Sequence, residues 1–316
     1  MRAYPGILAV LVLSAFAARA SEHAEHAGVS PLPTGVIDEL LVDAPEPSYV
    51  APTLRDRIGR VWAPVYINGK GPFRLVLDTG ANRTAITQPV ADRIGAPLLA
   101  SRARLIGVTG SAMVPVIHAE RLEVGDLLLT EQKLAIVQDV FGGAHGVLGA
   151  DGLGDKRVEI DFRNGLIAIK HARHKIRRFG YTRVPVQLLH GHLLIFNVKV
   201  AGVRAKAMLD TGAQVTIGNS TLREALERRN RRSSTYRIMG VTLVEQSGEA
   251  LDAPPVTIRN LTINNMKVTF GDFHVFDAWE LSERPALLIG MDVIGTLDAL
   301  IIDYKHKELL MRPQRW

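Results

Sequence analysis

The sequence has 316 residues, 47% of them hydrophobic, with no cysteine and a formal net charge of +6. The lack of cysteine excludes disulfide bonds, thiol catalysis and cysteine-ligated metals, so the core must be large enough to be stable alone. The positive charge concentrates at residues 171–178 and 228–232. Aromatic side chains do not alternate with these cations, which makes nucleic acid an unexpected partner. A solvated linker and a solvated helix end explain both runs, with attraction to acidic lipid or an acidic partner as the alternative.

Residues 1–20 have the pattern of a secretory signal peptide. Arg2 precedes an apolar run, Ile7 to Phe16, which is too short to cross a bilayer. The run ends at the small-x-small site Ala18-Arg19-Ala20. We expect cleavage after Ala20, with an uncleaved anchor as the alternative, and no stable membrane span afterwards. Export without disulfides favours a bacterial envelope protein, in the periplasm or secreted.

Residues 21–56 contain five prolines and little periodicity, which predicts an extended lead-in before the folded part. From there, strands 61–67 and 73–77 flank an Asn-Gly turn and predict a hairpin. The landmarks that follow are Asp-Thr-Gly at 78–80, a helix at 89–94, a glycine-centred stretch at 107–110, strands at 121–129 and 134–138, Val147-Leu148-Gly149, and a strand pair over 158–169.

The same landmarks recur in the same order in the second half. They are strands 194–200 and 205–209, Asp-Thr-Gly at 210–212, a helix at 220–229, a stretch at 240–242, strands at 256–263 and 266–270, Leu288-Ile289-Gly290, and strands at 299–304 and 309–311. Thr79 and Thr211 lie 132 residues apart. The chain is therefore expected to be two copies of one mainly β domain, residues 57–170 and 184–316, joined by a basic linker at 171–183.

Two aspartates at equivalent positions could activate a water for peptide hydrolysis. When two carboxylates lie close together they cannot both ionise easily, so they share one proton. The unprotonated carboxylate then takes a proton from the water while the other donates to the scissile carbonyl. Thr79 and Thr211 offer hydroxyls that can bond across the two loops, and Gly80 and Gly212 allow close backbone approach. No metal or cofactor is implied.

Both copies resemble the retropepsin-like aspartic proteases, in the strand followed by Asp-Thr-Gly-Ala, the downstream glycine flap and the apolar-apolar-Gly motif. The resemblance covers residues 60–312 and implies two β-barrel lobes that form a pepsin-like pseudo-dimer. It implies that Asp78 and Asp210 are the catalytic pair, and that Gly149 and Gly290 lie in the loop behind each aspartate. The flaps implied for substrate binding are Gly107, Val108, Thr109 and Gly110 in the first copy, and Gly240, Val241 and Thr242 in the second.

The second flap departs from the first because it lacks the second glycine found at Gly110. Neither flap has the aromatic residue of pepsin-like enzymes. The residue after Asp-Thr-Gly-Ala is Asn82 or Gln214, where viral enzymes tend to have Asp. These differences concern substrate contacts rather than the chemistry.

The sequence therefore predicts an exported aspartic endopeptidase that binds an extended polypeptide between its lobes. One chain supplies both aspartates, so a monomer is sufficient, and a higher assembly is not excluded. The main alternative is a catalytically silent periplasmic peptide-binding protein with the same cleft. A scaffold that docks envelope partners ranks last because it needs neither aspartate. The residues Asp151, Asp161, Asp292 and Asp303 are expected to be structural, and His190 and His192 to be exposed turn residues.

Overall fold

The computed structural model of the chain describes residues 8–10, 14–16, 49–52, 60–124, 127–140, 142–226, 233–240, 242 and 245–314. The predicted signal peptide and lead-in, residues 1–56, lie outside the described residues except for three short strands, β1 to β3. Val241 of the second predicted flap lies outside them as well. Within the part that is described, no helix is both long and apolar enough to cross a membrane.

The first half of the chain forms an eight-stranded sheet with the order β2-β7-β8-β4-β5-β10-β6-β9. Its strands are β2 (Ser14–Phe16), β4 (Trp62–Ile67), β5 (Lys70–Leu77), β6 (Ala85–Thr87), β7 (Leu98–Gly107), β8 (Gly110–Val124), β9 (Leu127–Val137) and β10 (Gly146–Leu148). Strand β8 also pairs with β9, which closes six of these strands into a barrel. Helix α1 (Gln88–Ile94) has a proline in its first turn and ends at Gly95, whose φ of 70° suits a left-handed cap.

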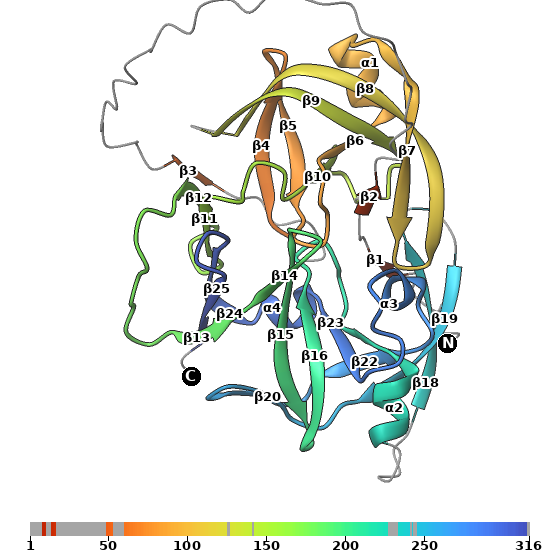
Figure 1. The fold of residues 1–316 in the computed structure, drawn as a ribbon, viewed down its shortest axis with the longest axis vertical. Coiled ribbons are helices and arrows are strands. Elements are labelled where there is room, and N and C mark those ends of the chain that lie inside the picture. Colours follow the sequence, from red (N-terminus) through yellow and green to blue (C-terminus); the bar gives the residue numbers. More distant parts are fainter. Residues whose placement is uncertain are drawn as a thin grey trace, which may run out of the picture.

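The second half forms an eleven-stranded sheet of similar plan. Its strands are β1 (Leu8–Val10), β14 (Gln187–Leu189), β15 (Leu193–Val200), β16 (Val203–Leu209), β17 (Ile217–Gly218), β18 (Ser233–Gly240), β19 (Glu245–Asp252), β20 (Val256–Ile258), β21 (Leu261–Ile263), β22 (Lys267–Phe270) and β23 (Ala286–Ile289). Its helices are α2 (Ser220–Leu226), α3 (His274–Ala278) and α4 (Met291–Ile294). The hairpins β4–β5 and β15–β16 occupy equivalent places in the two lobes (Figure 1).

A third sheet of six strands takes residues from both halves. Its order is β13-β25-β24-β11-β12-β3, built from β3 (Tyr49–Pro52), β11 (Lys156–Asp161), β12 (Leu166–His171), β13 (Thr182–Pro185), β24 (Leu297–Asp303) and β25 (Glu308–Pro313). Strand β11 of the first half pairs directly with β24 of the second. Across this pair Arg157 Nε lies 3.0 Å from the Asp303 carboxylate, and both side chains are buried. The third sheet therefore ties the two lobes together.

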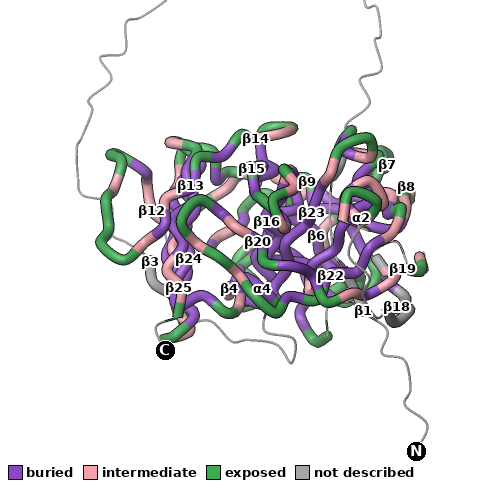
Figure 2. Tube along the Cα trace, turned by 90° about the horizontal axis from the view of Figure 1, so that it is seen from below, coloured by how far each residue is buried: buried purple, intermediate pink, exposed green. Residues whose placement is uncertain are grey.

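The core follows from the alternation of apolar and polar side chains along the strands. In β15, for example, Phe196, Val198 and Val200 are buried while Asn197 and Lys199 are exposed. One continuous apolar cluster includes buried residues of both lobes and of the third sheet. Figure 2 shows many buried residues along the strands in the interior of the molecule and exposed residues at the turns.

Mainly β architecture with two lobes is confirmed, but two predicted strands are wrong. The prediction of one strand over 121–129 overlooked the β8–β9 hairpin, in which β8 ends at Val124 and pairs there with Leu127, the first residue of β9. The prediction over 256–263 overlooked the β20–β21 hairpin, where Arg259 adopts a positive φ of 58°. An apolar run that contains a short turn resembles one continuous strand, because the β-propensity of the individual residues does not indicate where the chain reverses direction. Helix α2 is described as far as Leu226, and residues 227–229 of its predicted range lie outside the described residues.

Candidate active site

Asp78 and Asp210 each follow the end of a buried strand. Asp78 follows β5, and its N–H donates to the Leu148 carbonyl over 3.0 Å. Asp210 follows β16, and its N–H donates to the Ile289 carbonyl over the same distance. The side chains of both aspartates are almost fully buried. Each carboxylate is therefore fixed by the parallel strand that runs beside its own strand, β10 in one lobe and β23 in the other.

The two Asp-Thr-Gly loops face each other at the junction of the lobes. A Cβ atom placed on Gly80 would lie 2.7 Å from Oδ2 of Asp210, and one placed on Gly212 would lie 2.4 Å from Oδ2 of Asp78. No larger residue fits at either position because each carboxylate packs against the glycine of the opposite loop. The structure thus brings the predicted pair and both predicted glycines together.

Each carboxylate has one bonded and one unbonded oxygen. Oδ1 of Asp78 accepts the N–H groups of Gly80 at 2.8 Å and Ala81 at 3.1 Å. Oδ1 of Asp210 accepts the equivalent N–H groups of Gly212 and Ala213 at 2.8 and 3.0 Å. Both Oδ2 atoms are buried and have no hydrogen-bond partner among the described residues. A shared proton or a water between them would satisfy these two atoms.

The threonines of the two loops form a symmetric hydrogen-bond network. The Thr79 hydroxyl accepts the Thr211 N–H at 3.1 Å and donates to the Leu209 carbonyl at 2.8 Å. Reciprocally, the Thr211 hydroxyl accepts the Thr79 N–H at 3.1 Å and donates to the Leu77 carbonyl at 2.7 Å. Both threonines are fully buried. Each loop therefore relies on the threonine hydroxyl of the other loop for hydrogen bonds to its own buried N–H and carbonyl groups.

Behind each aspartate, a second repeated arrangement involves Gly149 and Gly290. A Cβ on either glycine would collide with backbone, at Arg83 in the first lobe and at Val215 in the second. The Gly149 N–H donates to the Thr84 hydroxyl, which in turn donates to Asp151 over 2.8 Å. The second lobe repeats this arrangement with its own residues, Gly290, Thr216 and Asp292. Asp151 and Asp292 thus hold the chain behind the aspartates.

Burial raises the pKa values of both central aspartates, Asp78 and Asp210. Loss of solvation raises the pKa of Asp78 to about 7, against the opposing effect of the N–H bonds from Gly80 and Ala81. Burial and the charge of Asp78 together raise the pKa of Asp210 well above its usual range. Two interacting carboxyls lose their protons as a pair, so near neutral pH this pair holds at least one proton.

The first predicted flap is a hairpin tip that reaches the opposite lobe. Gly107 pairs with Gly110 at the end of β7 and β8, leaving Val108 and Thr109 as the turn. Val108 is fully buried, and its carbonyl accepts the N–H of Val275 in α3 at 3.1 Å. Figure 1 shows the β7–β8 hairpin extending toward α3. The tip lies closed across the junction between the lobes.

The second predicted flap is also at a hairpin end, since β18 pairs with β19 up to Met239 opposite Glu245. Gly240 is the last residue of β18. Thr242 lines a hollow of about 610 Å³ together with first-lobe residues of β7, β8 and β9. Each flap therefore contacts the lobe to which it does not belong.

Three buried polar residues near the Asp-Thr-Gly loops were missed from the sequence. Arg60 is fully buried, and its positive charge lowers the pKa of Asp78. Burial and the charge of Asp78 raise the pKa of Tyr304, whose hydroxyl is buried without a partner in the described part of the chain. His192, expected in an exposed turn, is buried, and burial lowers its pKa, an effect that the carbonyl of Gly80 partly offsets.

Comparison with known protein families assigns both halves. A family described as gag-polyprotein putative aspartyl protease matches residues 63–155, and one described as aspartyl protease matches residues 196–293. Together the two matches cover more than half of the chain. The chain belongs to the retropepsin-like aspartyl proteases. A search of the curated proteins found no match.

The two aspartyl protease domains stand in tandem, and each matched segment contains one Asp-Thr-Gly loop and one apolar-apolar-Gly motif. This supports a peptidase with a peptide substrate. The pairing of the loops in space agrees with the arrangement that the resemblance implied, in which one chain carries both halves of a site.

The raised pKa values predict how the stability of this aspartyl protease family member depends on pH. A carboxyl whose pKa is higher in the folded state binds more protons when folded, so stability is greatest below the unfolded pKa and falls as pH rises through the folded one. We expect the free energy of unfolding to fall between about pH 4 and pH 7. Denaturant titrations across this pH range should show that the free energy of unfolding falls less steeply with pH for Asp78→Asn than for the original chain. If the free energy of unfolding fell equally with pH in both proteins, the raised pKa of Asp78 would be contradicted.

Proposed function

We propose that the protein is an exported aspartic endopeptidase in which Asp78 and Asp210 activate the attacking water. The facing, buried carboxylates are the observation that carries this proposal, because each has one free oxygen directed into the junction between the lobes. Export rests on the signal-peptide pattern of residues 1–20 alone.

In the proposed reaction the pair begins with one proton. The unprotonated carboxylate removes a proton from a water that lies between the two Oδ2 atoms, and that water attacks the scissile carbonyl carbon. The protonated carboxyl donates its proton to the carbonyl oxygen, which gives a neutral tetrahedral diol. The pair, which now holds the proton taken from the water, gives it to the amide nitrogen as the C–N bond breaks. A carboxylate takes a proton from one hydroxyl of the diol as that oxygen becomes the carbonyl of the acid product, so the pair again holds one proton. The threonine network holds the carboxylates in position during these transfers.

We infer that the substrate is an extended polypeptide, because the strands of both flaps pair with short extended segments of the chain. Strand β7 pairs antiparallel with β2, and β18 pairs in parallel with β1. Both partners are short extended segments that occupy these edges, which supports the proposal that a substrate strand can pair there. A substrate could pair with the same edges while its side chains enter adjacent hollows.

The hollow that Thr242 lines together with first-lobe residues favours an apolar substrate side chain. Its volume is about 610 Å³, and its lining includes Leu105, Met113 and Val137 in addition to Thr242. Burying an apolar side chain there would contribute roughly 1.5–3 kcal/mol to binding. We therefore expect cleavage next to large apolar residues.

The proposal is tested by incubating the exported chain with a mixture of unfolded peptides from about pH 4 to pH 9. We expect endoproteolytic cleavage beside apolar residues, inhibited by a pepstatin-type compound that mimics the tetrahedral diol. Cleavage should be greatest near neutral pH, because protonation of Asp78 below about pH 7 removes the base. Peptide bound but uncut at every pH would instead identify the catalytically silent binding protein.

A further inference from the structure

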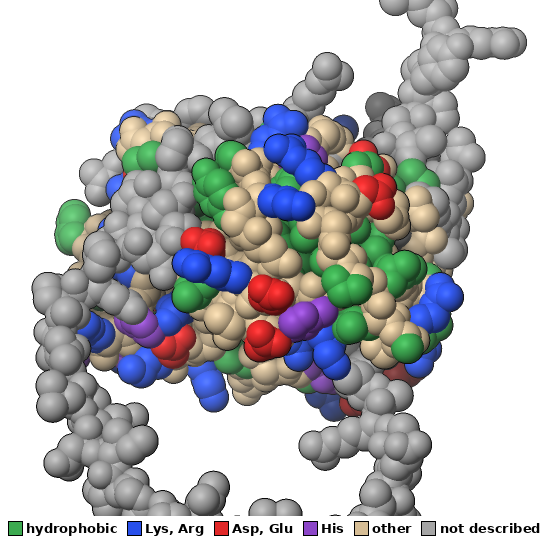
Figure 3. Space-filling model, turned by 90° about the horizontal axis from the view of Figure 1, so that it is seen from above, with side chains coloured by type: hydrophobic (Ala, Val, Ile, Leu, Met, Phe, Trp, Pro, Cys, Tyr) green, Lys and Arg blue, Asp and Glu red, His purple; other side chains and the backbone are tan. Residues whose placement is uncertain are grey.

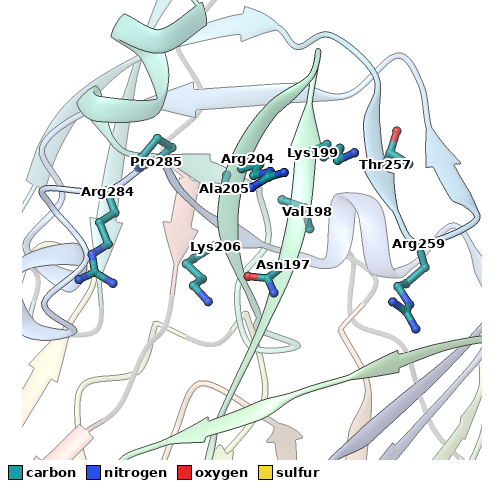
Figure 4. A pocket seen from close by; sticks show the side chains of 10 residues that line it. All are labelled: Asn197, Val198, Lys199, Arg204, Ala205, Lys206, Thr257, Arg259, Arg284 and Pro285. Atoms are coloured by element: carbon teal, nitrogen blue, oxygen red, sulfur yellow. The ribbon is translucent and has the colours of Figure 1, made fainter.

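The outer face of the second lobe carries a hollow that the proposed reaction does not use. It has a volume of about 730 Å³, in the range of small-molecule sites, and lies on the β15–β16 hairpin beside β20. Five of its ten lining residues are cations, and no carboxylate of the described residues lines it: Lys199, Arg204, Lys206, Arg259 and Arg284. Figure 4 shows Arg284 on one side of the hairpin and Arg259 on the other.

The strand register places three of these cations, Lys199, Arg204 and Lys206, on one face of the hairpin. Lys199 of β15 is directly opposite Arg204 of β16, and Asn197 is opposite Lys206. On the other side of β15, Lys199 is opposite Thr257 of β20. Like charges in directly opposed positions destabilise a sheet. None of the five cations forms an ion pair with the residues that the structure describes, so their mutual repulsion is not compensated within that part of the chain.

The first lobe provides an internal comparison, because its β4–β5 hairpin has the same register relative to its aspartate from Trp62 to Val65, after which the register shifts. The position of Lys199 is occupied there by Tyr66, and that of Arg204 by Pro72. Tyr66 is opposite Glu123, which corresponds to Thr257 and pairs with Arg121 at 2.8 Å. The duplicated fold therefore does not require the cations, and only the second lobe has gathered them.

Two other places on the described part of the surface have cations beside carboxylates. The face seen from above in Figure 3 has Lys and Arg side chains close to Asp and Glu side chains. In the basic segment before β13, Arg178 pairs with Glu159 and Lys175 with Glu308. The hollow on β15–β16 differs from these places because five cations line it and no carboxylate of the described residues does.

We propose that this hollow binds a soluble small molecule that carries two or more closely spaced phosphate groups. Arginine and lysine donate charge-assisted hydrogen bonds to phosphate oxygens, and Asn197 and Thr257 add neutral donors at the same face. The concave shape suits a free oligophosphate better than a flat lipid surface. None of the exposed large hydrophobic side chains of the described residues lines the hollow, so it lacks an anchor for insertion into a bilayer. The site lies outside the aspartate cleft, and its occupancy does not depend on catalysis.

The probe is inorganic tripolyphosphate, added to the full chain at constant ionic strength and followed by thermal unfolding and calorimetric titration. We expect a saturable increase in Tm of roughly 3–5 °C, because a ligand bound only to the folded state stabilises it. The Asp78→Asn protein should show the same increase, which separates this site from peptide hydrolysis.

The matched variants are the doubly substituted proteins Lys199→Gln/Arg204→Gln and Lys305→Gln/Lys307→Gln. Both remove two exposed positive charges, but only the first pair lines the hollow. We expect the first variant to have a higher Tm than the original chain without tripolyphosphate, because repulsion is relieved, and to bind tripolyphosphate about tenfold more weakly or worse. Equal binding by both variants would overturn the proposal, as would binding only to vesicles of acidic phospholipid.

Discussion

Replacing either Asp78 or Asp210 by asparagine is expected to lower kcat/KM for peptide cleavage by about 10³-fold or more. The amide cannot accept the proton of the water, and it cannot share a proton with the remaining carboxylate. Because the two aspartates act as one unit, the double variant should be no less active than either single variant. Initial rates on one fluorogenic peptide, measured for the three variants, give this comparison directly.

The fold should survive these substitutions, since asparagine has nearly the same shape and removes a buried ionisable group. Thermal unfolding of each variant checks this. Asp92→Asn is the matched control because Asp92 is an exposed aspartate on α1, and its activity should equal that of the original chain. If one of the two central variants kept substantial activity, the aspartates would not form a single site, and the proposed reaction would be wrong.

Replacing Thr79 by valine is expected to lower the free energy of unfolding by about 2–5 kcal/mol. Valine matches threonine in shape but leaves the Thr211 N–H and the Leu209 carbonyl without their hydrogen bonds. Both groups are buried, and each unsatisfied group costs about 1–3 kcal/mol. Thr211→Val should have a similar effect because its contacts are reciprocal. Urea titration of both variants measures the change.

Serine at position 79 retains the hydroxyl, so Thr79→Ser should recover most of the stability and activity that Thr79→Val loses. Thr262→Val, at an exposed position on β21, controls for the exchange of threonine for valine itself. A Thr79→Val protein as stable as the Thr79→Ser protein would show that the hydroxyl network does not hold the lobes together. Activity should fall with stability in Thr79→Val, because the two loops would no longer set each other's position.

Because the two lobes are copies of one domain, a comparison between them indicates which contacts the shared site needs and which features belong to one lobe alone. Where the copies serve the aspartate pair, their contacts are nearly identical, as in the matched distances around Asp78 and Asp210. At the ends of the hairpins farthest along the strands from the pair, the copies differ: Lys199 and Arg204 stand in the second lobe where the first has Tyr66 and Pro72. The outer face of the second lobe can therefore differ from that of the first lobe without changing the contacts around Asp78 and Asp210.

Local sequence patterns were sufficient for the β architecture and for the nature of the site. Apolar strands that end at Asp-Thr-Gly determine where each loop forms, and the repeat of the landmarks indicates two equivalent lobes. The glycines at 80 and 212 could also be assigned, because only a residue without a side chain permits such close approach. These features depend on neighbours along the chain, which a single sequence records.

Contacts between distant segments were decided only by the tertiary structure. The third sheet joins β11 to β24 because edge strands of both lobes need partners for their backbone groups, and no local pattern indicates which partner each one finds. Arg60, His192 and Tyr304 are buried, although arginine usually favours the surface and histidine and tyrosine are only intermediate in burial. The same holds for the flap, since Val108 is buried by α3 of the opposite lobe. Burial of this kind depends on how the two lobes pack, and that packing is a property of the whole chain.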